Sequence, residues 1–428
     1  MVSEPPAAER PTPPRVLVVA PHGSYRTAPF IDAARRLGAQ VLIASEGRHS
    51  VVSAYAEGLH IRFDDPQGSL ATVLAEAEQA PFAGVIGTDD ASTEFAARVA
   101  GRLGLAHNEP SAVRVARRKD LARARLAEAG VRVPDHRRVS LSAAASPAAQ
   151  VAGLGYPVVV KPLALSASRG VIRADGPDQL ERACQRVRRL LGAEQGLEAE
   201  AREHVLVERF VPGEEVALEG MLRGGELQVL AVFDKPDPLE GPYFEETYYV
   251  TPSRLAPGRQ AQLADTVAAA CRAYGLSEGP VHAECRINEA GVWVLEVAAR
   301  TIGGLCSRLL RVGTGYGLEE LVLAHAMGGR LEAEPEEGGA GVLMIPITQG
   351  GVLKRVEGLL EARRVPFVED IQIQIREGNE VVPLPEGASY LGFIFARAPT
   401  PAEAEQALRR AHACLNVVVA PLWRIQVA

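Results

Sequence analysis

Several features that mark large classes of protein are missing from this sequence of 428 residues. Its five cysteines show no short pair spacing, so the sequence predicts neither a disulfide framework nor a zinc site, which suits a cytoplasmic protein. No apolar run approaches the roughly 20 residues that span a bilayer, so we expect no membrane partner. The net charge of −7 provides no basic excess, so we expect no nucleic-acid partner.

Residues 1–14 are rich in proline and lack the apolar core of a signal peptide, so we expect a disordered tail there. The remaining length predicts about three domains. From residue 15, short apolar runs such as Val16–Ala20 and Val41–Ala44 alternate with helical patterns. This alternation predicts a parallel sheet with helices on both faces. No GxGxxG sequence follows the first strand, so a dinucleotide fingerprint is absent.

The later part of the chain predicts a different organisation. We expect a helix over about 111–129, which stops at Gly130, and then a β-rich segment that contains one helix over about 177–191. The last block mixes strands with a final helix over 401–413, which begins at a Thr-Pro-Ala-Glu capping signal.

Two glutamates in the stretch from Gly279 to Gly304 predict a charged hairpin. Strands His282–Ile287 and Val292–Val297 flank Glu289-Ala290-Gly291, which we interpret as a three-residue loop. Such a loop makes Glu284 and Glu296 direct cross-strand partners on one face, where like charges repel. A cation is therefore expected between them, and Mg²⁺ binds carboxylates together with substrate phosphates. The alternative is an exposed edge hairpin whose glutamates point to water.

A second pattern predicts a phosphate-binding loop. Strand Val158–Lys161 leads into a turn that contains Ser166, Ser168 and Gly170. Small residues let backbone N–H groups approach an anion closely, and Lys161 is well placed to meet phosphate. The alternative is a polar hairpin turn with a surface lysine.

The segment Leu206–Val216 ends its extended part at Pro212-Gly213. Its backbone can offer a carbonyl and an N–H to a flat heterocycle, and Glu208 and Glu215 can accept hydrogen bonds from ribose hydroxyls. The alternative is a strand that leaves a sheet and carries solvated glutamates.

Taken in order, these motifs resemble the ATP-grasp superfamily over residues 15–428, and within it the carboxylate–amine ligases known as L-amino-acid α-ligases. The stretch Gly279–Glu284 and the stretch Glu296-Val297-Ala298-Ala299-Arg300 carry most of the resemblance. Many ATP-grasp enzymes have Asn where this sequence has Ala298, which weakens the analogy with biotin carboxylase and leaves open whether one or two metal ions bind.

The resemblance implies an α/β fold with a Rossmann-like parallel-sheet domain at 15–110, an α+β ATP-grasp domain at 111–335 with a lid at about 134–210, and a C-terminal α+β domain at 336–428. It implies ATP with Mg²⁺ or Mn²⁺, amino-acid substrates joined through an acyl phosphate with release of ADP and phosphate, and a possible homodimer. The alternatives are an ATP-grasp ligase or carboxylase that acts on another carboxylate, and a nucleotide-binding module without turnover.

Carried over position by position, the resemblance also implies the roles of single residues. Arg300, Lys161 and His282 are the expected catalytic residues, and Glu284 and Glu296 the expected metal ligands. The expected ATP contacts are Lys119, Lys161, Ser166, Ser168, Gly170, Glu208, the backbone of Arg209 and Val211, and Glu215. The expected substrate contacts are Asp90, His282, Arg300, Gly303 and Gly304.

For five of these positions a structural role stays open. His282 could be a buried histidine bonded to a carbonyl, and the role of Arg300 could be limited to an ion pair with a glutamate. Asp90 could be a plain loop carboxylate. The two glycines could serve a tight turn, although we expect them to leave space for a large first amino acid.

Overall fold

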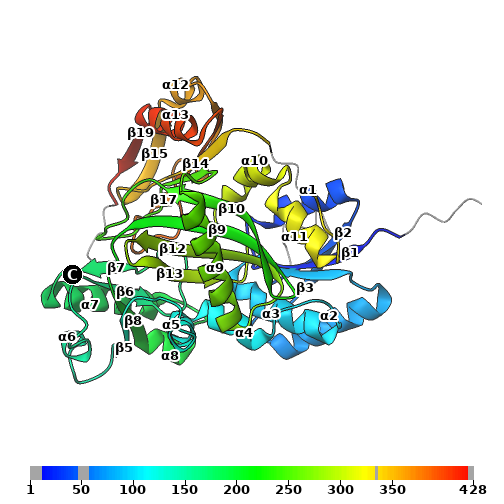
Figure 1. The fold of residues 1–428 in the computed structure, drawn as a ribbon, viewed down its shortest axis with the longest axis horizontal. Helices are drawn as coiled ribbons and strands as arrows, with labels where there is room; N and C mark the ends of the chain where they lie inside the picture. The colour runs from blue at the N-terminus through cyan, green and yellow to red at the C-terminus, as the bar shows by residue number, and fades with distance from the viewer. Residues whose placement is uncertain (1–11, 47–56, 333–335, 423–428) are drawn as a thin grey trace, which may run out of the picture. The chain divides into compact units, whose positions relative to one another are not determined.

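The computed structural model describes residues 12–46, 57–332 and 336–422, and the chain divides into two compact units (Figure 1). The first unit comprises Met1–His107 with Glu319–Leu331, and the second comprises Asn108–Leu318 with Glu332–Ala428. Of the predicted N-terminal tail, residues 1–11 lie outside the described residues. In the part of the chain that the structure describes, no helix combines the length and apolar character needed to cross a membrane.

The first unit contains the parallel sheet that the alternating pattern predicts. Its four strands stand in the order β3 (Glu57–His60), β2 (Gln40–Ser45), β1 (Arg15–Val19) and β4 (Gly84–Gly87). All of β1 except Arg15 is buried, as expected of a central parallel strand. The described helices of this unit are α1 (Thr27–Leu37), α2 (Pro66–Gln79), α3 (Asp90–Arg102) and most of α11 (Leu318–Ala326).

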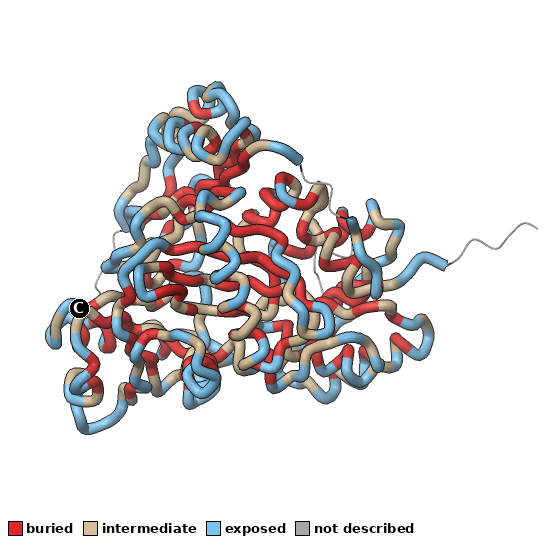
Figure 2. The backbone as a smooth tube through the Cα atoms, in the orientation of Figure 1, coloured by how far each residue is buried: buried red, intermediate tan, exposed pale blue. Residues whose placement is uncertain are grey.

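The second unit is centred on an eight-stranded antiparallel sheet. In spatial order its strands are β13 (Gly291–Ala298), β12 (Gly279–Asn288), β9 (Glu214–Arg223), β10 (Glu226–Lys235), β11 (Tyr248–Thr251), β14 (Gly339–Ile345), β18 (Gly392–Ala398) and β16 (Val368–Ile373). Helix α9 (Pro257–Tyr274) packs Leu263 and Val267 into the same core as Val281 of β12. At the other end, α13 (Pro401–Ala413) packs Leu408 against β14 and β18. Figure 2 shows the buried residues following these strands.

A four-stranded sheet occupies the region in which the resemblance places the lid. Its order is β5 (His136–Ser140), β8 (His204–Arg209), β6 (Val158–Pro162) and β7 (Ile172–Ala174). Helix α7 (Pro177–Ala193), predicted over about 177–191, covers it with Leu180 and Val187. Besides two helices that meet at Arg118, the remaining described elements of the second unit are α6 (Pro147–Gln150), α8 (Ala199–Glu203), the 3-10 helix η2 (Cys306–Leu310), α10 (Arg311–Thr314), α12 (Leu359–Arg363) and the sheet of β17 (Glu380–Val381), β15 (Gly351–Glu357) and β19 (Asn416–Ala420).

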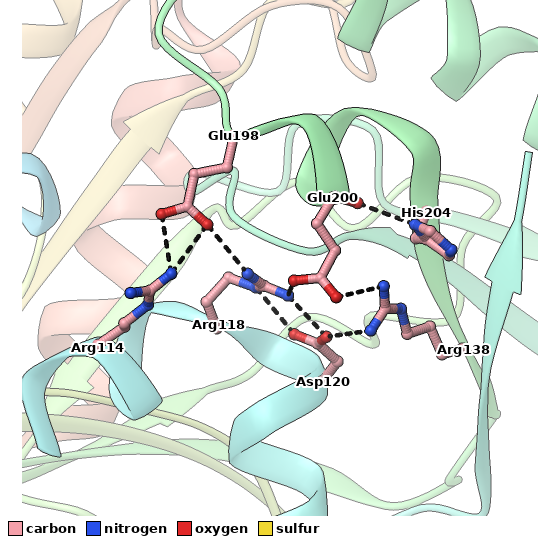
Figure 3. A network of polar contacts seen from close by, with 7 residues as sticks. All are labelled: Arg114, Arg118, Asp120, Arg138, Glu198, Glu200 and His204. Atoms are coloured by element: carbon pink, nitrogen blue, oxygen red, sulfur yellow. Dashed lines mark hydrogen bonds and ion pairs between the residues drawn. The ribbon is translucent and has the colours of Figure 1, made fainter. Parts of the chain in front are cut away.

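The single helix predicted over about 111–129 is wrong, because the chain breaks it at Arg118. Helix α4 (Pro110–Arg117) ends there and α5 (Lys119–Glu128) begins, with Arg118 at φ −114° and ψ 105°. The Arg118 side chain is 6% exposed, and its Nη2 lies 2.8 Å from Asp120 Oδ2 and 3.0 Å from Glu200 Oε2. Figure 3 shows this network of ion pairs, which joins α4 and α5 to α8 and β5. The residue after the break, Lys119, lies at the end of β6, where its N–H donates to Leu163 O at 3.0 Å.

Candidate active site

The predicted pairing of the two glutamates is confirmed, although the loop that joins their strands is shorter than predicted. Glu284 lies opposite Glu296, and His282 lies opposite Ala298. Because Asn288 pairs with Gly291, the loop has two residues, not three. A β-bulge after Glu284 supplies the missing residue and restores the register. The extra residue of the bulge is Leu295.

Positive charge lies beside both glutamates, as the like-charge argument requires. Lys119 Nζ lies 3.4 Å from Glu296 Oε2, and Lys235 Nζ lies 3.4 Å from Glu284 Oε1. His282 Nε2 lies 3.5 Å from the same Glu284 oxygen. The glutamate side chains are 26% and 30% exposed, so they are neither fully buried nor solvated as an exposed hairpin would be.

Lys235 and Glu246 were not predicted as site residues. Lys235 ends β10, and Glu246 lies in the segment that follows this strand. Glu215, Glu246 and Glu284 can each offer one carboxylate oxygen within 4.8 Å of one another, a spacing suited to a cation. Lys235 Nζ lies 2.9 Å from Glu215, 2.5 Å from Glu246 and 3.4 Å from Glu284. The Lys235 side chain is only 3% exposed, and the three carboxylates hold its pKa well above the ordinary value despite burial.

These carboxylates differ in their affinity for protons. Burial raises the pKa of Glu246 to about 7. The pKa of Glu284 stays well below its usual value, because Lys235 and His282 outweigh the effect of burial. Glu284 therefore keeps its negative charge more readily than Glu246 does.

Lys161 is held in place, which argues against the alternative of a surface lysine. Its Nζ lies 2.6 Å from Glu208 Oε2, and the other Glu208 oxygen accepts a hydrogen bond from Arg123 of α5. Glu208 is 1% exposed, so it is not a solvated strand residue. Although burial raises the pKa of Glu208, the two cations lower it to about 2. Both Glu208 oxygens are thus paired, and its predicted contact with ribose stays a prediction.

The loop between β6 and β7 has the backbone of a specialised turn. Ala167 and Ser168 both have positive φ angles, 55° and 54°, which cost of order 1–3 kcal/mol each in non-glycine residues. Gly170 has φ 70°, and a Cβ there would lie 2.7 Å from Pro162 Cγ, so only glycine fits. Lys119 Nζ donates to Leu165 O at 2.8 Å.

The C-terminal part of the second unit fastens this loop. Gly170 N–H donates to Pro385 O at 2.9 Å, so that N–H is already used and is not free for phosphate here. Arg169 Nε donates to Glu386 O at 3.3 Å. Arg186 of α7 binds both Glu386 carboxylate oxygens, at 2.5 and 2.7 Å. We call these contacts the lid latch.

His282 is a buried histidine, but carboxylates and not a carbonyl are its partners. Its Nδ1 lies 3.1 Å from Glu219 Oε2, and Glu219 is fully buried. Burial lowers the pKa of His282, yet the contacts with Glu219 and Glu284 raise it to about 9. Glu219, which the sequence reading also missed, accepts the Ile302 N–H at 3.1 Å with its other oxygen. The pair therefore ties Glu284 to the turn that follows Arg300.

The backbone at Gly304 favours glycine, and the expected space for a large first amino acid stays a prediction. Gly304 has φ 62°, and a Cβ built there would lie 3.1 Å from Phe393 Cε1 of β18. A side chain at position 304 would therefore press on the ring of Phe393. Arg300 is 9% exposed and its Nη1 donates to Thr301 O at 3.0 Å.

Comparison with known proteins adds to this geometry. Family models match the ATP-grasp N-terminal domain at residues 31–107, the ATP-grasp domain at 154–308 and the L-amino acid ligase C-terminal domain 2 at 343–420. The crystal structure of an L-amino acid ligase from Bacillus licheniformis matches with a TM-score of 0.78 and 25% identity, over 96% of this chain and 100% of that one. The chain is an ATP-grasp ligase that resembles the L-amino-acid ligases.

Curated relatives of this ATP-grasp ligase are distant. An uncharacterized protein of Sinorhizobium fredii is 25% identical over 396 residues, which are 92% of this chain and 80% of that protein. The alanine–anticapsin ligase of Bacillus subtilis is 27% identical over 263 residues, 56% of this chain and 54% of that enzyme. The ligase thus matches only about half the length of that relative, and its own substrates do not follow from the comparison.

The residues of this ATP-grasp ligase fit ATP and Mg²⁺. Enzymes with this fold use both. Paired carboxylates such as Glu284 and Glu296 are the hard oxygen ligands that Mg²⁺ requires. Lys119, Lys161 and Lys235 are largely buried cations whose partners in this structure are carboxylates or carbonyls, which phosphates can replace.

The remaining predicted residues stand at different places. Arg209 ends β8 and its N–H donates to Asp135 O at 2.8 Å, while the Val211 carbonyl accepts from Arg286. Asp90 is the first residue of α3 in the first unit, and its contact with a substrate ammonium stays a prediction.

Proposed function

We propose that this ligase joins two amino acids through an acyl phosphate. An oxygen of the first amino acid's carboxylate attacks the γ-phosphorus of ATP, and the bond to the β-phosphate oxygen breaks to release ADP. The amine of the second amino acid then attacks the acyl carbon. The carbon–oxygen bond breaks, phosphate leaves, and the amine loses a proton as the amide forms. No covalent intermediate on the enzyme is needed.

The observation that carries this proposal is the hairpin on which Glu284 and Glu296 face each other, each with a lysine 3.4 Å away. When bound there, Mg²⁺ or Mn²⁺ would neutralise charge on the phosphate oxygens. Phosphoryl transfer depends on positioning and charge neutralisation more than on covalent chemistry by the protein. A site in which partly buried carboxylates lie beside lysines suits that requirement.

In this proposal the other residues neutralise the charge of the substrates and keep water from the acyl phosphate. Lys119 and Lys161 neutralise the ATP phosphates, and Arg300 neutralises the first substrate's carboxylate. His282, held between two glutamates, fixes the position of Glu284. The loop with Ser166 and Ser168 covers the phosphates, which protects the acyl phosphate from water.

A substrate screen tests the proposal. The purified protein is supplied with MgATP and pairs of amino acids, single amino acids, or other carboxylates and bicarbonate, and ADP, phosphate and ligated product are measured. We expect ADP and phosphate in equal amounts with a ligated pair. Lys161→Ala, as control, should raise the ATP requirement and lower turnover. Turnover only with bicarbonate or a non-amino-acid carboxylate would overturn the proposal in favour of another ATP-grasp reaction.

A further inference from the structure

We propose that Arg286 is a positioning residue that fixes the nucleotide-facing segment, residues 209–215, against the carboxylate cluster of Glu215, Glu246 and Glu284. The proposal rests on the proposed function, because the adenine-facing role of that segment does. Arg286 lies on β12, two residues after Glu284, and is 4% exposed.

The guanidinium of Arg286 uses all three of its nitrogens, two on the segment 209–215 and one on the segment after β10. Nη1 donates to the Val211 carbonyl at 2.7 Å, and Nε donates to Glu215 Oε2 at 3.0 Å. Nη2 donates to the carbonyl of Leu239, in the segment after β10. Because the guanidinium is a rigid planar fork, these three bonds fix the relative positions of the segments.

Arg286 also contacts the segment 209–215 through the aromatic ring of Phe210. The Arg286 guanidinium carbon lies 4.8 Å from the centre of the Phe210 ring, and that of Arg173 lies 4.5 Å from it. The Phe210 N–H donates to Pro157 O at 2.9 Å. Arg286 thus holds both the side chain of Phe210 and the carbonyl of Val211, the residue whose backbone is proposed to face adenine.

Arg286 also connects that segment to the acidic cluster. The second oxygen of Glu215 accepts from Lys235 Nζ at 2.9 Å, and Lys235 lies 3.4 Å from Glu284. A continuous series of polar contacts therefore runs from the Val211 carbonyl through Arg286, Glu215 and Lys235 to Glu284. Movement of the nucleotide-facing backbone would strain the position of the carboxylates, and the reverse also holds.

Lysine and methionine at position 286 separate this role from plain core packing. Lysine keeps the positive charge beside Glu215 but cannot also reach the Val211 and Leu239 carbonyls with a fixed fork. Methionine removes the charge as well and leaves Glu215 with Lys235 alone. Arg173→Met is the matched control, because Arg173 stacks on the same ring but bonds to Asp175 and to the Glu240 carbonyl, not to Val211.

The experiment measures equilibrium binding of MgATP and steady-state kinetics for the wild type, Arg286→Lys, Arg286→Met and Arg173→Met. Arg286→Lys should weaken ATP binding by about 10- to 100-fold, comparable to the loss of one buried hydrogen bond from a charged donor, and should change the KM for amino acids less than about twofold. Arg173→Met should stay within about threefold of wild type for ATP.

Each outcome decides a separate claim. If Arg286→Lys melts near the wild-type temperature and binds ATP equally well, Arg286 is only a packing residue and the inference fails. Equal losses for ATP and for amino acids would also overturn it, since they indicate general damage. If Arg286→Met does not fold, the lysine variant still decides. A wild type that binds ATP but ligates no amino acids would refute the proposed function, while the binding data would still test Arg286.

Discussion

Replacing Glu208 with glutamine should destabilise the second unit by about 3–5 kcal/mol at neutral pH, because the change leaves a buried charge without its partner. The Arg123 side chain is 1% exposed and pairs with Glu208 through Nε. Its other anchor is the neutral carbonyl of Leu295, which cannot balance the charge. Lys161 contributes less to the loss, because its side chain is 13% exposed and closer to water.

The lowered pKa of Glu208 gives a second value for its contribution to the free energy of unfolding. Its pKa in the folded protein is about 2, below the ordinary 4.5. The unfolded chain therefore takes up this proton first as the pH falls, so the stabilisation is complete above about pH 4.5 and is lost toward pH 2. A difference of roughly 2.5 pKa units corresponds to roughly 3 kcal/mol.

Urea unfolding followed by tryptophan fluorescence, to which Trp293 on β13 contributes, measures both effects. The unfolding free energy of Glu208→Gln should fall at pH 7, and its further loss between about pH 4.5 and the acid limit should be smaller than in the wild type. Glu128→Gln on α5 is the control, because Glu128 is 69% exposed and should change stability by less than about 0.5 kcal/mol. Adding Arg123→Met to Glu208→Gln should restore part of the loss. A loss below about 1 kcal/mol, or an unchanged acid profile, would refute the reasoning.

Three further predictions follow from the site and the lid latch. Glu284→Gln or Glu296→Gln should lower turnover at least about 100-fold with a melting temperature near wild type, and retained turnover would exclude both as metal ligands. Arg186→Gln or Glu386→Gln should raise the phosphate released per ligated product about two- to fivefold, because a surface pair of this kind is worth at most about 1 kcal/mol. A double variant that exchanges the two charges should restore the ratio of phosphate to ligated product. An unchanged ratio in the single variants would show that the lid latch does not exclude water. Gly304→Trp should lower the melting temperature, since its φ of 62° and its close neighbour leave no room, and an unchanged melting temperature would contradict the structure there.

Local pattern was sufficient for the strands and for the pairing of Glu284 with Glu296, because hydrophobic alternation fixes which side chains share a face. It was not sufficient for the loop, where a bulge at Leu295 compensates for a shorter turn. The two glutamates remain opposite each other although the predicted loop length was wrong.

Contacts between segments that are distant in the sequence could not be predicted from it. Lys235 meets Glu215, Glu246 and Glu284 only because antiparallel pairing brings four separate segments together. The Phe-Asp-Lys-Pro sequence around Lys235 was the available signal, since a lysine at the end of an apolar strand is costly unless paired. The break at Arg118 had no local signal, because neither proline nor glycine marks it and tertiary ion pairs maintain it.

The burial of the Glu208 side chain could also not be predicted from the sequence. The same pattern fits a solvated glutamate and a buried one, and only the approach of α5 to the lid sheet shows which is present. The metal, nucleotide and substrate roles of single residues, the domain boundaries near 110 and 335, a homodimer and a cytoplasmic location remain predictions.

The most direct test of the central claim follows an oxygen atom. The first amino acid is labelled with ¹⁸O in its carboxylate and incubated with the protein, unlabelled ATP, Mg²⁺ and a second amino acid, and the released phosphate is analysed by mass spectrometry. An acyl phosphate intermediate predicts one ¹⁸O atom in each phosphate, together with ADP and a ligated product. Unlabelled phosphate, or label in AMP with release of pyrophosphate, would contradict the account.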